Sequence, residues 1–551
     1  MRRLAALAAG LCLAACATAP ATPAQESRAY ADFLIGRVAN ARSDHAAAAD
    51  RYFAALARNP GDQALVEGAL LASLASGDVV RARRAARMAD RDDAPAYAYI
   101  VRAADALATQ RYAQAGAELD RVQGTASEEL LARMVANWAR AGQGHAGDIA
   151  ADLAPLASIR PYGGLFAYQQ AMVLDYSGQQ TEALAAYDAA SRGGLWLPGG
   201  VARHADLLMR TGARDQALAL LGAEGNSGNP ALAAMRAQIV AGQPTTIERL
   251  TPARGAAAAV YGMSAIFRQE HDNANSLAAL TLALMLDPTF DGARLALAQQ
   301  QAELGHVAAA RRMLSEVSPA SPYAASARTL EAWMVYDSGD EDGAIALARA
   351  VADESGDVRS RRTLADMYRN ASRFAEAEPI YSEIIAAQPN DWRPYFSRGA
   401  SRERLGRWPE AEADFQRALE LSPEQPDVLN YLGYSWVDRG EHLQEGLAMI
   451  RRAAEIRPMS GAIIDSLGWA YFRLGDYSQA VDWLEAAVRL EPADATLNEH
   501  LGDAYWRMDR RIEARFQWQR ALTFNPDNPD ALRAKIENGL PAEPAPRTVN
   551  R

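Results

Sequence analysis

The sequence predicts an all-α fold in which helical hairpins stack side by side into a superhelix. Pro389, Pro423, Pro458, Pro492 and Pro526 follow one another at intervals of 34, 35, 34 and 34 residues. Between these prolines, apolar residues recur at helical spacing, and Gly and Ala recur at fixed positions. A single helical hairpin cannot bury its apolar face alone, so copies of this unit are expected to stack on their neighbours.

The recurring unit matches the tetratricopeptide repeat (TPR), with its pattern W-x2-L-G-x2-Y…A-x3-F…P. One copy carries the pattern at Ile464, Leu467, Gly468, Tyr471, Ala480, Leu484 and Pro492. The small residues let the two helices of a hairpin approach closely, and the proline ends the second helix. Aromatic residues at pattern positions are expected in the core, and these are Trp436, Tyr471, Tyr505 and Trp518.

About fourteen such repeats account for nearly all of the chain after residue 28, in two segments of a helical-hairpin solenoid. The expected parts are an N-terminal array (29–230), a degenerate hinge where the pattern fails (231–256), a C-terminal array (257–526), a capping helix (527–540) and a disordered tail (541–551). Repeats are predicted to begin near Ala29, Gln63, Ala96, Glu128, Gly164, Pro198, Ala257, Asp291, Ala325, Val358, Trp392, Pro426, Gly461 and Ala495.

The N-terminus has the form of a bacterial lipoprotein signal peptide. Two arginines precede an apolar run of ten residues, which is too short for a membrane span of about 20 residues. The run ends in Leu-Ala-Ala-Cys16, which resembles a lipobox, so residues 1–15 are expected to be removed and Cys16 to carry acyl chains such as palmitate. Residues 16–28 would form a flexible tether. The alternative is an ordinary secretion signal with an incidental cysteine.

Composition and motifs argue against several other classes of protein. The net charge of −11 argues against a general nucleic-acid binder. Cys12 and Cys16 are the only cysteines, so the body holds no disulfide framework or cysteine-based zinc site. Gly142–Gly147 matches G-x-G-x-x-G, but it falls where a hairpin turns, with no strand before it. No cofactor, metal or catalytic residue is predicted.

The candidate binding residues lie near the C-terminus, at positions of the first helix of each repeat that face the concave side in this family. Several are aromatic side chains that the repeat pattern does not require, flanked by charged and amide groups suited to a peptide partner. The predicted partner-binding groove consists of Asn430, Tyr434, Asp438, Asp465, Trp469, Phe472, Arg473, Glu499, Asp503, Trp506 and Arg507. The alternative is that these aromatic residues pack only on neighbouring helices.

Residues 430–522 also resemble a proteobacterial family of large TPR lipoproteins more closely than a generic repeat. The resemblance rests on Tyr431-Leu-Gly-Tyr-Ser-Trp-Val-Asp-Arg-Gly440, Asp465-Ser-Leu-Gly-Trp-Ala-Tyr471 and His500-Leu-Gly-Asp-Ala-Tyr-Trp506. Some members of that group are outer-membrane adaptors that bring peptidoglycan hydrolases or other envelope proteins to carboxyl-terminal processing proteases. Ala17, in place of Asp, favours the outer membrane by resemblance to lipoprotein sorting in enterobacteria. A shared fold does not transfer a function by itself.

The expected function is therefore that of a non-catalytic scaffold or adaptor, attached by lipid to the outer membrane and facing the periplasm. Its partner would be an envelope protein, such as a protease and its client. Another hypothesis is a component of outer-membrane, pilus or polysaccharide-export assembly. A hypothesis of a different class is an enzyme with an unrecognised site in residues 231–256 or on the groove.

Overall fold

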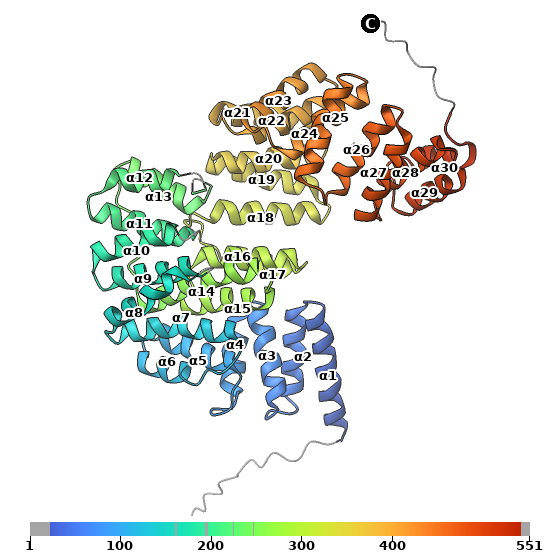
Figure 1. Cartoon of the computed structure of the whole chain (residues 1–551). Helices are drawn as coiled ribbons and strands as arrows, with labels where there is room; N and C mark the ends of the chain where they lie inside the picture. Colours follow the sequence, from blue (N-terminus) through green and yellow to red (C-terminus); the bar gives the residue numbers. More distant parts are fainter. Residues whose placement is uncertain are drawn as a thin grey trace, which may run out of the picture. The chain divides into compact units, whose positions relative to one another are not determined.

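The computed structural model describes residues 23–159, 162–192, 197–223, 225–226, 228–245 and 247–541. Within these ranges the chain is helical and contains no β-strand, which confirms the predicted all-α fold (Figure 1). No helix in the described ranges has the length and apolar character needed to cross a bilayer. The predicted signal peptide, Cys16 and nearly all of the predicted tail lie outside the described residues.

The chain divides into two compact units, Met1–Ser338 (unit 1) and Gly339–Arg551 (unit 2). The helices of unit 1 are α1 (Pro23–Ala41), α2 (His45–Leu56), α3 (Gln63–Ala75), α4 (Val79–Met88), α5 (Ala96–Ala108), α6 (Tyr112–Leu119), α7 (Ala126–Gly142), α8 (Ala146–Leu153), the 3-10 helix η1 (Ala154–Ser158), α9 (Gly163–Tyr176), α10 (Gln180–Arg192), α11 (Pro198–Arg210), α12 (Arg214–Gly222), α13 (Pro230–Val240), α14 (Pro252–Gln269), α15 (Asn273–Leu286), α16 (Asp291–Glu303), α17 (Val307–Ser315) and α18 (Ala324–Asp337).

The helices of unit 2 are α19 (Glu341–Ser355), α20 (Val358–Asn370), α21 (Phe374–Ala387), α22 (Trp392–Arg404), α23 (Trp408–Leu421), α24 (Pro426–Arg439), α25 (Leu443–Ile456), α26 (Gly461–Arg473), α27 (Tyr477–Leu490), α28 (Ala495–Arg507), α29 (Arg511–Thr523) and α30 (Pro529–Asn538). Consecutive helices pair into antiparallel hairpins, such as α24 with α25 and α26 with α27. First helices of neighbouring repeats also contact each other, α24 with α26 and α26 with α28, so the first helices line the inner side of the array.

Short polar signals set the ends of these helices. Asp62, Asp357 and Asp494 each precede a first helix, and each carboxylate accepts a hydrogen bond from a backbone N–H in the first turn. Between the helices of a hairpin, Gly406 and Gly475 adopt φ values of +74° and +81°, a conformation that side chains disfavour. Many helices accordingly begin at the predicted repeat starts, among them α3, α20, α24, α26 and α28.

Helices α14 and α15 fill the inner side of unit 1. Helix α14 packs on α5, α7 and α9, and α15 packs on α3 and α5, all first helices of earlier repeats. Every residue of α15 from Ser276 to Leu286 is buried. The Thr281 hydroxyl donates to the Leu74 carbonyl at 2.7 Å, and the Gln301 amide donates to the Ala75 carbonyl at 2.6 Å. The early repeats therefore close around a later part of the same chain.

Some boundaries differ from the sequence-based expectation. The segment 23–28, expected in the flexible tether, begins helix α1, because Pro23 suits the first position of a helix and good helix formers follow it. The expected hinge at 231–256 holds most of α13 and the start of α14, while the units divide after Ser338 instead. The repeat predicted near Ala325 is split, since α18 belongs to unit 1 and α19 to unit 2.

Candidate functional site

The inner side of α24, α26 and α28 in unit 2 carries a stack of three flat side chains. Trp469 and Phe472 project from α26 and stack with their ring centroids 4.7 Å apart. His500 from α28 also stacks on Trp469, with the ring centroids 4.1 Å apart. The repeat brings the three rings together: α26 supplies Trp469 and Phe472, and α28, the first helix of the next repeat, supplies His500. The stack gives a rigid, partly exposed aromatic surface.

Three buried polar atoms beside this stack have no hydrogen-bond partner among the described residues. They are Oδ1 of Asn430, Oδ1 of Asp465 and Nε1 of Trp469. Asp465 is only 5% exposed. Leaving such a group unsatisfied costs about 1–3 kcal/mol, and most buried polar groups in proteins are paired. Two acceptors and one donor on α24 and α26 are thus buried without a partner among the described residues.

The charges around the stack are organised by Asp465. Its second oxygen, Oδ2, lies 2.8 Å from Nδ1 of His500. Burial lowers the pKa of His500, but the carboxylates of Asp465, Asp503 and Glu499 together outweigh it, and the pKa is raised above its ordinary value. Burial, followed by the charges of Asp438 and Asp465, raises the pKa of Tyr434 to about 12, so its hydroxyl stays protonated. At the outer edge, Arg473 donates to the Asp438 carboxylate at 2.5 Å.

The remaining four predicted groove residues contact the chain's own last helix or the residues that follow it. Lys535 of α30 lies 2.7 Å from both Glu499 and Asp503. Burial raises the pKa of Asp503, and the Lys535 charge opposes that rise. Gly539 lies directly against the Trp506 ring. The Arg507 guanidinium donates to the Pro541 carbonyl at 2.9 Å. These four residues thus contact the chain's own C-terminal residues, and the other predicted groove residues do not share those contacts. The candidate surface considered further consists of Asn430, Tyr434, Asp438, Asp465, Trp469, Phe472 and Arg473.

The aromatic residues assigned to the core behave largely as expected. Trp436, Tyr505 and Trp518 are buried, and Tyr471 is partly buried against the same core. Trp518 also donates from Nε1 to Asp503 at 2.9 Å. His500 is the one member of the stack that was not predicted. It follows Asp465 by 35 residues, close to one repeat, and that spacing places it on the next first helix.

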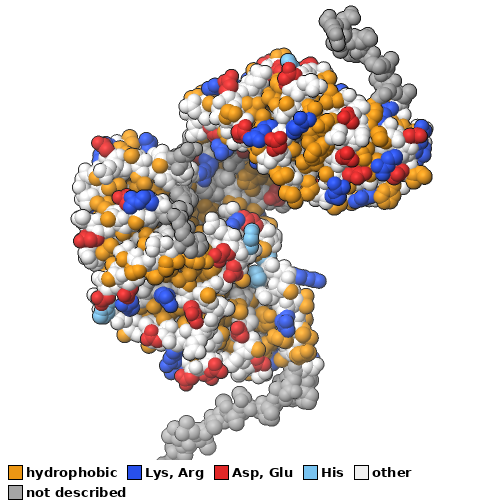
Figure 2. All heavy atoms as spheres, viewed as in Figure 1, with side chains coloured by type: hydrophobic (Ala, Val, Ile, Leu, Met, Phe, Trp, Pro, Cys, Tyr) orange, Lys and Arg blue, Asp and Glu red, His pale blue; other side chains and the backbone are white. Residues whose placement is uncertain are grey.

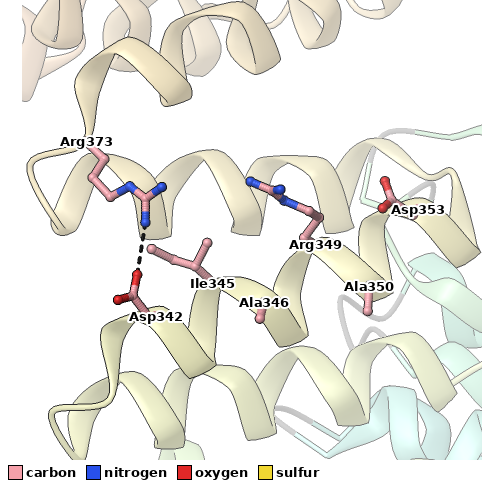
Figure 3. Close-up of a pocket in the computed structure, with 7 residues that line it drawn as sticks. All are labelled: Asp342, Ile345, Ala346, Arg349, Ala350, Asp353 and Arg373. Atoms are coloured by element: carbon pink, nitrogen blue, oxygen red, sulfur yellow. Dashed lines mark hydrogen bonds and ion pairs between the residues drawn. The ribbon is translucent and has the colours of Figure 1, made fainter.

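A second candidate is a shallow hollow of about 360 Å³ along α19 (Figure 3). Its lining residues are Asp342, Ile345, Ala346, Arg349, Ala350, Asp353 and Arg373. The Asp342 carboxylate accepts a hydrogen bond from Arg373 at 3.1 Å, and Arg349 bonds to the Tyr368 hydroxyl. Because its two arginines are engaged with groups of unit 2 itself, this hollow offers a ligand less than the stack does. No cluster of metal-ligating side chains occurs among the residues that the structure describes.

Comparisons with known proteins agree with this architecture. Residues 468–509 match a family model described as TPR repeat, and residues 362–426 and 396–459 match one described as tetratricopeptide repeat. A TPR repeat-containing protein of Pseudomonas aeruginosa is 27% identical over 139 residues, which are 25% of this chain and 23% of that protein. The BBSome complex member BBS4 of Bos taurus is 20% identical over 192 residues, 35% of this chain and 37% of that protein. The chain thus spans well under half the length of these relatives.

Solved structures with the same repeat have low overall similarity. A TPR protein from Parabacteroides merdae shares 14% identity, with a TM-score of 0.38, over 45% of this chain and 98% of that one. YrrB, described as a TPR protein with an unusual peptide-binding site, shares 20% identity with a TM-score of 0.27, over 34% of this chain and 96% of that one.

The helices and the matched repeats define the class of the protein. It is an all-α tetratricopeptide-repeat solenoid, and such repeats generally mediate binding between proteins. The matched models describe tetratricopeptide repeats between residues 362 and 509.

Proposed function

We propose that this protein is a non-catalytic scaffold that binds an extended polypeptide segment on the inner side of α24 and α26. The observation that carries the proposal is the group of three unpartnered polar atoms, on Asn430, Asp465 and Trp469, beside an aromatic stack. Rigid aromatic residues next to polar groups are typical of the side chains that dominate the energy of binding.

The chemistry of the three atoms suits a peptide backbone. Trp469 Nε1 donates, so it pairs with a carbonyl, whereas the oxygens of Asp465 and Asn430 accept, so they pair with N–H groups. Asp465 and Trp469 are four residues apart and face the same side of α26. An extended segment presents both kinds of group along one edge, and its side chains can pack on the Trp469 and Phe472 rings.

We further propose that Cys16 carries the lipid anchor and that the protein faces the periplasm from the outer membrane. There it would deliver cell-wall hydrolases or other envelope proteins to a carboxyl-terminal processing protease. The lipobox-like Leu-Ala-Ala-Cys16, Ala17 and the resemblance of residues 430–522 to adaptor lipoproteins support this part.

A matched pair of tryptophan variants tests the binding surface. Trp469→Ala removes the ring at the centre of the stack, and Trp483→Ala removes a partly buried tryptophan of α27, the second helix of the same repeat. Crosslinking in envelope preparations should recover a partner that the first variant loses and the second retains, with helicity unchanged in both. A peptide of that partner should bind about 30-fold more weakly to Trp469→Ala, equivalent to about 2 kcal/mol. If the two variants bound the peptide with equal affinity, the stack would not be the binding surface.

Two further measurements address the anchor and the protease. The mass of the mature N-terminal residue should include acyl chains, and Cys16→Ser should abolish them. A carboxyl-terminal processing protease from the same organism should degrade an envelope substrate faster when the protein is added, and Trp469→Ala should remove the acceleration. Hydrolysis of peptidoglycan or peptides by the purified protein alone would contradict the scaffold.

A further inference from the structure

Helix α1, the first helix of unit 1, packs against the rest of the unit on one side only. Its inner side packs on α2, where Gly36 lies against the Tyr52 ring. Asp32 is also on that side and pairs with Arg51 at 3.2 Å and Arg58 at 2.5 Å. Of the side chains described between Ser27 and Ala41, Asp32 is the only carboxylate. The inner side is thus satisfied by packing and by ion pairs.

The outer side of α1 is apolar and exposed. Tyr30, Leu34, Ile35 and Val38 are 63%, 43%, 48% and 52% exposed. Since a helix turns about 100° per residue, these four side chains fall on one continuous arc. Hydrophobic side chains gather where α1 lies on the face shown in Figure 2. The end helix of a repeat array normally presents a polar outer surface to water, so an apolar arc on α1 is unusual.

Arginines flank the apolar arc. Arg28 lies toward its Ile35 edge, Arg37 borders its Tyr30 edge, and Arg42 directly follows the helix. None of the three forms an ion pair with a carboxylate among the described residues, whereas Arg51 and Arg58 nearby do. Arg37 also lies over the Phe33 ring, at 5.9 Å from its centroid. An apolar arc bordered by arginines that are not neutralised by carboxylates is the pattern of a helix that lies in the interface of an anionic membrane.

We infer that the outer side of α1 lies on the anionic phospholipid surface to which Cys16 is attached. The inference rests on the lipid anchor of the proposed function. Cys16 precedes the first residue of α1, Pro23, by seven residues, which span at most about 25 Å when extended. The chain as a whole carries a net charge of −11, so an anionic membrane surface repels most of it. A locally basic and apolar helix such as α1 is therefore the part of the chain that approaches the membrane.

The same contact orients unit 1 on the membrane. Tyr30, Leu34 and Val38 would enter the boundary between headgroups and acyl chains by roughly 5–10 Å, while the arginines contact phosphates. The first repeat would then be held against the bilayer, in addition to the tether at Cys16.

A fluorescent probe at Val38 tests the inference in the full, lipidated chain. Because Cys12 leaves with the signal and Cys16 is acylated, Val38→Cys supplies a single reactive thiol for an environment-sensitive dye. Val240→Cys on α13 is the matched control, since both valines are similarly exposed, at 52% and 57%. The protein is placed in vesicles of phosphatidylethanolamine and phosphatidylglycerol, with or without brominated acyl chains.

The dye at residue 38 should shift to the blue and be quenched by the brominated lipid, and the dye at residue 240 should remain in water. Equal behaviour at the two positions would overturn the inference. So would a residue-38 dye that is shielded only as protein concentration rises and is not quenched by brominated lipid, which would indicate a second copy of the chain on α1.

A separate control shows whether Cys16 is acylated. If it is not, its free thiol reacts with the dye in the chain of natural sequence. In that case the Val38→Cys and Val240→Cys variants are made with Cys12→Ser and Cys16→Ser and added to preformed vesicles. Quenching at residue 38 alone would still support the membrane face of α1, and equal behaviour would overturn it. In this unlipidated chain, changing Arg28, Arg37 and Arg42 to Gln should weaken partitioning about a hundredfold.

Discussion

Units 1 and 2 are built from the same kind of helical hairpin, yet their first helices face different surroundings. In unit 1, α14 and α15 occupy the inner side of α3, α5, α7 and α9. In unit 2, the inner side of α24 and α26 holds an aromatic stack and buried polar atoms with no partner among the described residues. Unit 1 covers these first helices with later helices of its own chain, whereas the stack in unit 2 stays partly exposed.

The residues on the inner positions explain this difference. Along α5, the positions that correspond to Asp465 and Trp469 are Ile100 and Ala104, which are apolar and fully buried, so another helix can lie close against them. Along α26, Asp465 and Trp469 occupy the inner positions instead. A helix like α15, which is apolar on all sides, suits the first surface and would leave the polar atoms of the second unpaired. The repeat therefore sets the framework, and a few inner positions decide between a closed core and a binding surface.

The largest expected effect comes from a charge placed in α15. Leu280 is fully buried, so Leu280→Asp should destabilise unit 1 by more than about 4 kcal/mol, because an unpaired charge cannot be accommodated there. Hydrogen exchange should show loss of protection in α3, α5 and α7 together with α15. If those first helices stayed protected while α15 alone opened, α15 would be a removable plug, and unit 1 would hold a latent groove.

The exposed residue Val240 provides the control for this variant. Val240→Asp lies on the surface of α13 and should change stability by no more than about 0.5 kcal/mol. Binding of a partner peptide by unit 2 should be the same in this control as in the unmodified chain.

The next effect separates the core of unit 2 from its binding surface. Trp518 is completely buried against α28, so Trp518→Ala should destabilise unit 2 by about 3–5 kcal/mol. Trp469→Ala, by comparison, should reduce partner affinity much more than stability, because its ring is partly exposed. Chemical denaturation followed by tryptophan fluorescence measures the first quantity and peptide titration the second. Similar losses of stability in both variants would place Trp469 in the core.

The repeat and many of its boundaries could be predicted from the sequence because each is encoded locally. Spaced prolines, a glycine such as Gly468 and an N-terminal aspartate such as Asp494 act within one hairpin. The filling of unit 1 was not predicted, because it joins residues about two hundred positions apart, such as Leu74 and Thr281. The run from Leu277 to Leu286, apolar except for Thr281, was the available signal, since a helix without a polar face must be buried on all sides.

The candidate site was predicted in part for a similar reason. Family geometry places Asp465, Trp469 and Phe472 on the inner side of α26, where the stack is found. It does not say what the end of the chain does. Lys535 reaches back to Glu499 and Asp503, and that contact depends on the path after α29, which the repeat pattern does not describe. The pairing of the Lys535 charge with these two carboxylates can be recognised only when the position of α30 is known.

A smaller effect should appear in the pH dependence of unit 2. The pKa of His500 is raised in the folded state by Asp465, so the folded chain binds the proton more tightly than the unfolded chain. The resulting stability is fully present below the ordinary histidine pKa of about 6.5 and is lost as pH rises through the raised value. Protection of α26 and α28 should therefore fall by an amount of order 1 kcal/mol on going to alkaline pH.

His500→Gln identifies the group responsible. This variant should lose the pH dependence assigned to His500 but keep that of Asp503, whose pKa is also raised by burial. The difference between the two hydrogen-exchange profiles isolates the titration of His500 beside Asp465, Asp503 and Glu499. An unchanged profile in the variant would show that another group titrates.

The smallest expected effect comes from the hollow on α19 (Figure 3). The Asp342 side chain is 94% exposed, so its ion pair with Arg373 is worth only about 0.2–1 kcal/mol. Arg373→Ala should therefore change the stability of unit 2 by less than about 1 kcal/mol, including the loss of its contact with the Tyr368 ring. Partner affinity should remain within about twofold of the unmodified chain, because the hollow holds no unpartnered buried atom comparable to Oδ1 of Asp465 among the described residues. Isothermal titration of the same partner peptide measures this directly. A loss of affinity as large as that of Trp469→Ala would move the binding surface from α26 to α19.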